Sequence, residues 1–183
     1  MNNKTVDVEN GVGFTAKASL VTSEGTIEET YAIAKYMAHG HATILGSSHE
    51  ERAKIDQWCM WGYTTLVPCQ FDASMAIYGH KEVSQAAFTA SVNAIKAHAK
   101  DLNANLKSKS WLVGDNVTLA DLSVATQLVF AMQCVLDGGF RKAMPDLSAW
   151  FERVCALPDW VAINGKIKAC QKGIKPQIKA EPK

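Results

Sequence analysis

The chain lacks any long hydrophobic run. None of its 183 residues lies in a stretch of about 20 uncharged apolar residues, the length that a membrane-spanning helix needs. The first twenty residues carry Lys4, Asp7, Glu9 and Lys17 and no apolar segment, so we expect no secretory signal. A Cys-x-x-Cys pair is also missing, and the five cysteines are an odd number. This composition predicts reduced, packed thiols in a cytoplasmic protein without a membrane partner.

The chain as a whole also lacks an excess of one sign of charge. Its formal net charge is +1, but residues 164–183 contain six lysines and one glutamate, so the rest of the chain sums to −4. We interpret residues 174–183 as a basic flexible tail, with weak contact to tRNA through its lysines as the alternative. Neither a glycine-rich phosphate loop nor a nucleic-acid-binding motif accompanies these lysines.

Residues 1–46 have a different pattern from the rest of the chain. Residues 5–8 alternate between polar and apolar, residues 14–22 form a second candidate strand, and a short third strand starts at Ile27. Residues 30–37 then change to helical spacing. The pattern predicts a small sheet with one helix, too little to bury a core alone.

Residues 47–173 show helical patterns throughout. We expect a first helix that Pro68 ends or kinks, and a long amphipathic helix from about Glu82 to Leu106. Pro145 and Pro158 suit the first turns of two further helices. The last of these is expected to bury one face, composed of Trp160, Ile163, Ile167 and Cys170.

The segment Thr118-Leu119-Ala120-Asp121 has the spacing of an N-terminal helix cap. The Thr118 hydroxyl can accept the amide three residues on, and the Asp121 carboxylate can reach back to the amide of the cap residue. The residues that follow are apolar on nearly every side, which is typical of a buried helix. We therefore assign Thr118 and Asp121 a structural role at the start of a central helix.

These motifs together resemble the glutathione transferase superfamily. The similar segments are Trp111-Leu112-Val113-Gly114, the cap at 118–121, and Glu29-Thr30-Tyr31-Ala32-Ile33. The resemblance implies a mainly α fold, in which a transferase C-terminal-like helical bundle follows a truncated thioredoxin-like α/β half.

Two groups within that superfamily resemble the chain most. Residues 140–145, Trp150-Phe151 and residues 165–170 resemble the N-terminal domain of the translation elongation factor 1 gamma subunit. Residues 34–37 and 51–58 resemble domains appended to glutamyl- and methionyl-tRNA synthetases and their cofactors. Both groups use the fold mainly to hold translation proteins together. The resemblance thus implies a scaffold that binds other translation-complex subunits, as a homodimer or heterodimer, either in the nucleotide-exchange complex or, alternatively, in a synthetase complex.

Transferase activity is the second alternative. In this superfamily it needs a Tyr, Ser or Cys near the first strand of a complete thioredoxin-like half, and residues 1–46 are too few for one. Ser19 also takes the place of the family's cis-proline. Glu29 and Thr30 match the pair that holds glutathione in the family. We interpret Thr30 first as a helix cap and second as a relic glutathione contact. We expect no catalytic residue and no cofactor.

The remaining candidates are surface residues. Trp61 lies off the apolar face of its helix and could serve as an interface aromatic. Arg153 lies between inward-facing residues, at a place where the family often stacks an arginine against a partner, with a solvated helix charge as the alternative. His39, His41 and His49 are close in sequence but lack further ligands, so we expect loop histidines and no metal site.

Overall fold

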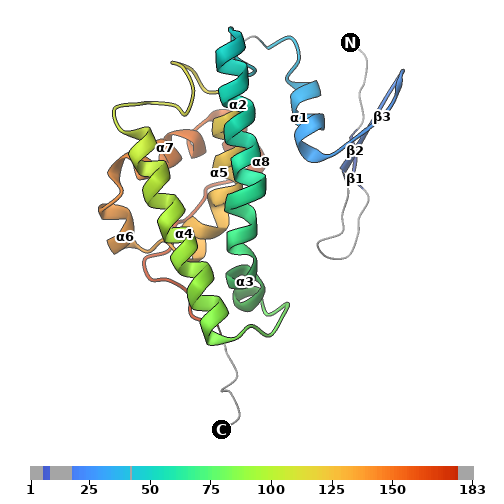
Figure 1. Cartoon of the computed structure of the whole chain (residues 1–183). Coiled ribbons are helices and arrows are strands. Elements are labelled where there is room, and N and C mark those ends of the chain that lie inside the picture. Colours follow the sequence, from blue (N-terminus) through green and yellow to red (C-terminus); the bar gives the residue numbers. More distant parts are fainter. Residues whose placement is uncertain (1–5, 9–17, 42, 177–183) are drawn as a thin grey trace.

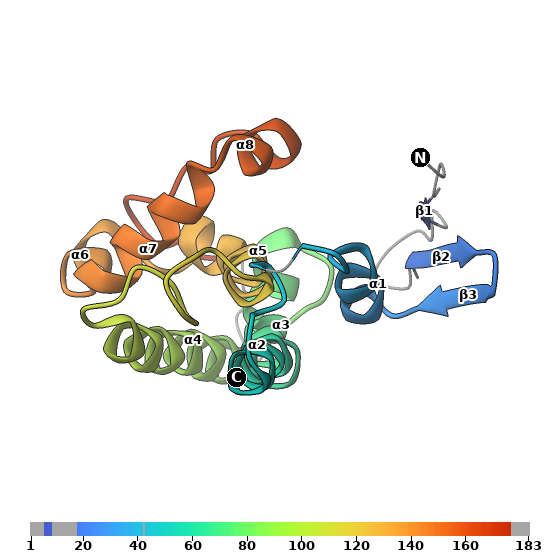
Figure 2. The ribbon, with the colours of Figure 1, turned by 90° about the horizontal axis from the view of Figure 1, so that it is seen from above.

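A computed structural model describes residues 6–8, 18–41 and 43–176. It consists of a small sheet with one helix and a larger bundle of helices (Figure 1). In the view from above, α1 stands between the sheet and the bundle (Figure 2). The expected combination of a truncated thioredoxin-like half with a helical domain is thereby confirmed. Within the described ranges, no helix is both long and apolar enough to cross a bilayer.

The sheet is antiparallel and has three short strands. They are β1 (Val6–Val8), β2 (Ala18–Thr22) and β3 (Gly25–Glu28), in that spatial order. Helix α1 (Thr30–Met37) packs against β2 and β3. The core of this part is small because, in the described segments, only Leu20 and Ile33 are buried hydrophobic residues there. Among the described residues of α1, Tyr31 and Ala34 pack partly buried against the core of the bundle.

The sequence predicts that Pro68 ends or kinks the first helix of the bundle, and in the structure the helix does not end there. Helix α2 (His49–Trp61) continues through a π-helical turn, η1 (Gly62–Leu66), into α3 (Val67–Tyr78). The Val67 amide donates to the Gly62 carbonyl five residues back, which widens the helix just before the proline. Pro68 then lies in the first turn of α3, where a missing N–H costs little.

The rest of the bundle surrounds one buried helix. The elements are α4 (Gln85–Leu106), α5 (Leu119–Cys134), α6 (Gly138–Lys142), α7 (Pro145–Cys155) and α8 (Pro158–Asn164). Helix α4 starts three residues later than expected, because the Ser84 hydroxyl accepts the Ala87 amide and caps it there. Helix α5 contacts α2, η1, α3 and α7, and most of its residues are buried. It forms the centre of the core.

The last expected helix is shorter than predicted. Helix α8 ends at Asn164 because Gly165 follows with φ 68°, which breaks the helix. Ile163 is 82% exposed, and Ile167 and Cys170 lie beyond the helix. The chain instead returns along the end of α5, where the Cys170 amide donates to the Met132 carbonyl (3.0 Å) and the Ile174 amide to the Cys134 carbonyl (2.7 Å). The attached segment thus reaches Ile174, while residues 177–183 of the expected tail lie outside the described residues.

Candidate functional site

The residues that match the family's glutathione pair lie at the start of α1. Glu29, not Thr30, occupies the cap position, with φ 70° and no side-chain cap hydrogen bond. Thr30 is the first residue of the helix, so its assignment as the cap was wrong. The reason is the sharp turn out of β3, which puts the unusual backbone conformation on Glu29. Both side chains are exposed.

Trp61 is half-buried between α2 and α4. Its ring lies edge-on to Trp58, with centroids 5.4 Å apart, and to His98 of α4, at 6.0 Å. It also packs against the hydrophobic core. This packing explains Trp61 as a structural residue, and its role at an interface stays a prediction.

The more exposed apolar surface lies beside Trp61 along α2, η1 and α3. Five large hydrophobic residues there are between 37% and 55% exposed: Met60, Tyr63, Val67, Phe71 and Tyr78. We call these five the α2–α3 stripe. Successive members are three, four, four and seven residues apart, so they follow one side of the continuous helix. Contiguous exposed apolar residues are a common feature of interaction surfaces.

Sequence reasoning missed this stripe. The prediction considered the inward face of each helix and had the first helix end or kink at Pro68, which divides the stripe between two segments. The signal that could have found it is a second apolar repeat on the same helix, out of phase with the buried one. Recognising that repeat required knowledge that the helix continues through η1.

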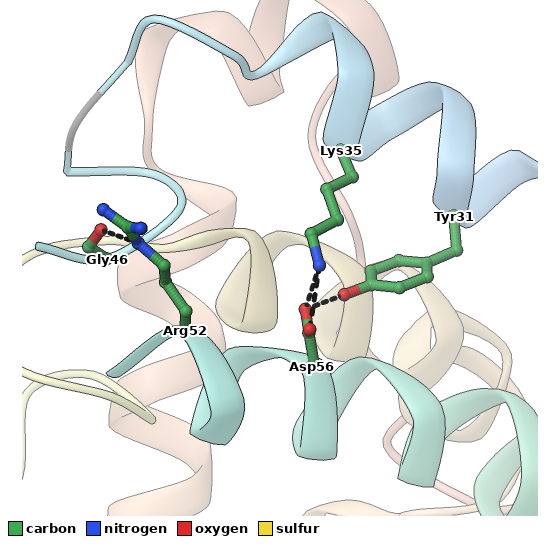
Figure 3. Close-up of polar contacts among 5 residues, drawn as sticks. All are labelled: Tyr31, Lys35, Gly46, Arg52 and Asp56. Carbon is green, nitrogen blue, oxygen red and sulfur yellow. Dashed lines mark hydrogen bonds and ion pairs between the residues drawn. The ribbon is translucent and has the colours of Figure 1, made fainter. Parts of the chain in front are cut away.

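The small half is joined to the bundle by a polar cluster between α1 and α2 (Figure 3). Lys35 Nζ lies 2.8 Å from Asp56 Oδ2 and 2.9 Å from Asp56 Oδ1, and the Tyr31 hydroxyl donates to the same carboxylate. Although partial burial opposes it, hydrogen bonds from Lys35 and Tyr31 hold the pKa of Asp56 below its usual value. Burial and the neighbouring carboxylate raise the pKa of Tyr31. Tyr31 therefore remains a hydrogen-bond donor.

Arg153 is held by its own chain. Its Nη1 donates to the Ser110 carbonyl at 2.7 Å, and its guanidinium carbon lies 5.7 Å from the centre of the Trp111 ring. The side chain is exposed and fastens the loop that precedes α5 onto α7. These contacts give Arg153 a structural function, and a role in partner binding stays a prediction.

Thr118 and Asp121 form a buried hydrogen-bond network at the start of α5. Asp121 Oδ2 accepts the Thr118 amide (2.9 Å) and hydroxyl (3.0 Å). Its other oxygen accepts the Leu112 amide and Trp150 Nε1, both at 2.8 Å. Burial raises the pKa of Asp121, and these four hydrogen bonds oppose that rise. The links to Leu112 and Trp150 could not be read from the motif, because they join residues that are distant in sequence.

The possible metal ligands and the cysteine thiols of the described segments were candidates for catalysis. No group of three His, Cys, Asp or Glu side chains there could hold a metal ion, so His39, His41 and His49 form no such site. Burial raises the pKa values of the Cys59, Cys69 and Cys155 thiols to about 11, which keeps them protonated at neutral pH.

Comparison with known proteins agrees with this architecture. A model of the glutathione S-transferase C-terminal domain family matches residues 56–158. Elongation factor 1-gamma of Artemia salina is 32% identical over 146 residues, which are 80% of this chain and 34% of that protein. The Sus scrofa protein of the same name is 30% identical over 144 residues, 79% of this chain and 33% of that protein. The chain therefore spans about a third of the length of these curated relatives.

Solved structures give the same fold. The transferase-like domain of elongation factor 1-gamma from Saccharomyces cerevisiae superposes with a TM-score of 0.79 at 20% identity, over 86% of this chain and 76% of that one. Poplar glutathione transferase F1 superposes with a TM-score of 0.68 at 19% identity, over 79% and 71% of the two chains. At such identities the superpositions concern the fold alone. The match of the family model to more than half of the sequence shows that this chain belongs to the glutathione S-transferase C-terminal domain family.

Proposed function

We propose that this chain is a non-catalytic interaction module of the translation machinery, with a scaffolding role like that of the elongation factor 1 gamma subunit in the nucleotide-exchange complex. The observation that carries the proposal is the 30–32% identity to elongation factor 1-gamma proteins over about four fifths of the chain. That role assigns the protein to the cytoplasm. The relatives named above are elongation factor 1-gamma proteins, which favours this assignment over the synthetase complex.

The reduced first half supports a non-catalytic role. Only three short strands and one helix precede the bundle in the described segments. The exposed Glu29 and Thr30 are the residues that match the family's glutathione pair. Two side chains on one turn supply too few contacts to position a thiol for reaction. We therefore infer that transferase chemistry has been lost.

The α2–α3 stripe is the surface that we propose for docking. Burying exposed apolar area is the main driving force for protein association, and aromatic and Met side chains are enriched at interfaces. Tyr63, Phe71 and Tyr78 supply three aromatic rings along the stripe. The proposed occupant is a transferase-like domain of another translation-complex subunit.

Affinity purification of the full tagged chain from its native source, followed by mass spectrometry, tests this function. We expect co-purification of elongation-complex subunits, their loss with Phe71→Ser, and their retention with Ile163→Ser. Ile163 is a matched control because it is an exposed apolar helix residue outside the stripe. Recovery of synthetases instead would contradict the assignment. Light scattering identifies self-association, which would replace the proposed partner by a second copy.

A direct assay separates the scaffold from the transferase. We expect no retention on immobilised glutathione and no turnover of an electrophilic aromatic substrate with glutathione. Retention together with turnover would overturn the non-catalytic proposal. The tRNA alternative predicts salt-sensitive RNA binding that disappears when the residues after Gly173 are removed.

A further inference from the structure

A hollow of about 380 Å³ lies where the segment between α1 and α2 crosses the start of α2. Its polar lining comes from the end of α1, the connecting segment and two turns of α2: Lys35, His39, His41, Arg52 and Asp56. Leu45 and Ile55 supply the apolar part of the lining. We call this space the linker hollow. Its volume falls within the range of small-molecule sites, and neither the family comparison nor the proposed docking role assigns it a ligand.

Arg52 is the best-placed cation of the linker hollow. Its Nε donates to the Gly46 carbonyl at 3.2 Å, which fixes the guanidinium at the wall (Figure 3). A guanidinium has five N–H donors, and this contact uses one of them. Among the residues that the structure describes, Arg52 has no carboxylate partner. Its Nη groups therefore remain for an anion, and their planar arrangement matches a phosphate group.

The backbone behind Arg52 is packed closely against α2. Gly46 is buried at φ 81°, and a Cβ atom there would approach Glu51 Cβ to 2.9 Å and Ile55 Cδ1 to 3.1 Å. The connecting segment is also tied at Ile44, whose carbonyl accepts the Leu119 amide of α5 at 2.9 Å. The backbone segment that Arg52 contacts is thus held in place, so ligand binding would need little ordering of that segment.

The charges of the linker hollow favour an anion. Its one carboxylate, Asp56, is already paired with Lys35 and hydrogen-bonded to Tyr31. Arg52 is left as a net positive charge, and His39 and His41 add donors on the side of the connecting segment. We propose that the linker hollow binds a small phosphate monoester, with the phosphate on Arg52 and the ester group against Leu45 and Ile55.

Phenyl phosphate is a suitable probe because it combines a phosphate with a compact apolar group. The test is an NMR titration of the full isotope-labelled chain with phenyl phosphate. A parallel titration with benzoate, which carries a carboxylate in place of the phosphate, is the control. We expect saturable shifts at His41, Gly46 and Arg52, and at least tenfold weaker binding of benzoate. Shifts confined to the lysines after Asn164 would overturn the site, and equal binding of benzoate would overturn the phosphate assignment.

Variants on one helix give the matched comparison. Arg52→Gln removes the guanidinium, whereas Lys54→Gln removes an equal charge that is paired with Glu50. We expect the dissociation constant for phenyl phosphate to rise at least tenfold in Arg52→Gln and to change less than twofold in Lys54→Gln. Arg52→Lys should show an intermediate value because it keeps the charge but loses the planar fork. Equal weakening by the two glutamine variants would assign the effect to overall charge and overturn the proposal.

Discussion

Trp150 Nε1 donates to Asp121 Oδ1 at 2.8 Å, and both side chains are fully buried. Asp121 therefore joins three parts of the bundle: α5 through Thr118, the preceding loop through Leu112, and α7 through Trp150. A motif that looks like a local helix cap is in fact the polar centre of the domain.

The first prediction concerns this network. A helix cap alone contributes about 0.5–2 kcal/mol. Asp121→Ala would also leave the buried donors of Leu112 and Trp150 without partners, so we expect a loss of about 3–5 kcal/mol in the free energy of unfolding. Urea denaturation measures it. The exposed Asp101→Ala should change stability by less than about 0.5 kcal/mol. A loss below 2 kcal/mol for Asp121→Ala would show that only the cap matters.

The second prediction concerns pH. Because the pKa of Asp56 is lowered in the folded protein, its contribution to stability is present above the ordinary Asp pKa and is lost as pH falls through the folded value. Asp56→Asn should cost up to about 1 kcal/mol at pH 7, since the pair is partly exposed. The difference between wild type and variant should shrink as pH falls from about 5, through the ordinary Asp pKa and on through the lower folded value. A difference that stays constant with pH would contradict the role of the ion pair.

The third prediction concerns the π-helical turn. A Cβ atom at Gly62 would overlap the carboxamide of Gln127, lying 2.8 Å from Cδ. Gly62→Ala should therefore force the flexible carboxamide of Gln127 to move, and we expect a loss of about 1 kcal/mol or less in the free energy of unfolding. Gln127→Ala removes the obstructing group. The loss in the free energy of unfolding of the double variant should therefore be smaller than the sum of the losses in the two single variants. Strictly additive losses, measured by thermal unfolding, would disprove the contact.

The fourth prediction concerns the segment after α8. Arg141 Nη1 donates to the Cys170 carbonyl at 2.6 Å and also to the Leu136 carbonyl. Arg141→Gln should loosen this segment, and we expect amide exchange at Cys170 and Ile174 to accelerate roughly tenfold, or about 1.4 kcal/mol. Hydrogen-exchange mass spectrometry measures this. Lys142→Gln is the control, because Lys142 is exposed on the same short helix. Equal acceleration in both variants would count against the contact.

The sequence predicted the elements whose signals are local. The cap before α5, the hairpin at Thr22–Gly25 and the prolines at the starts of α7 and α8 each depend on neighbouring residues. It left open whether the helix ends or kinks at Pro68, and it extended α8 too far. In both places a backbone feature, a π-helical hydrogen bond or a glycine at positive φ, outweighed the apolar repeat.

The candidate sites depended less on local signals. Trp61 was chosen because it lies off an apolar face, but it packs against His98. Arg153 was chosen because the family often stacks an arginine at that place, but it fastens Ser110. These partners are 37 and 43 residues away, so no spacing rule could supply them. The linker hollow was missed for the same reason, whereas the α2–α3 stripe was missed because its repeat runs across Pro68.

The sequence by itself thus determined a helical domain with a capped, buried central helix and a reduced α/β half. Helix caps and apolar periodicity depend on neighbouring residues, and the length of the first half can be counted directly. Only the tertiary structure decided that Asp121 joins three elements, that α2 and α3 form one helix with an exposed apolar side, and that Arg52 faces a hollow. Those relationships arise when distant segments pack together, and burial and charge pairing then fix the role of each side chain.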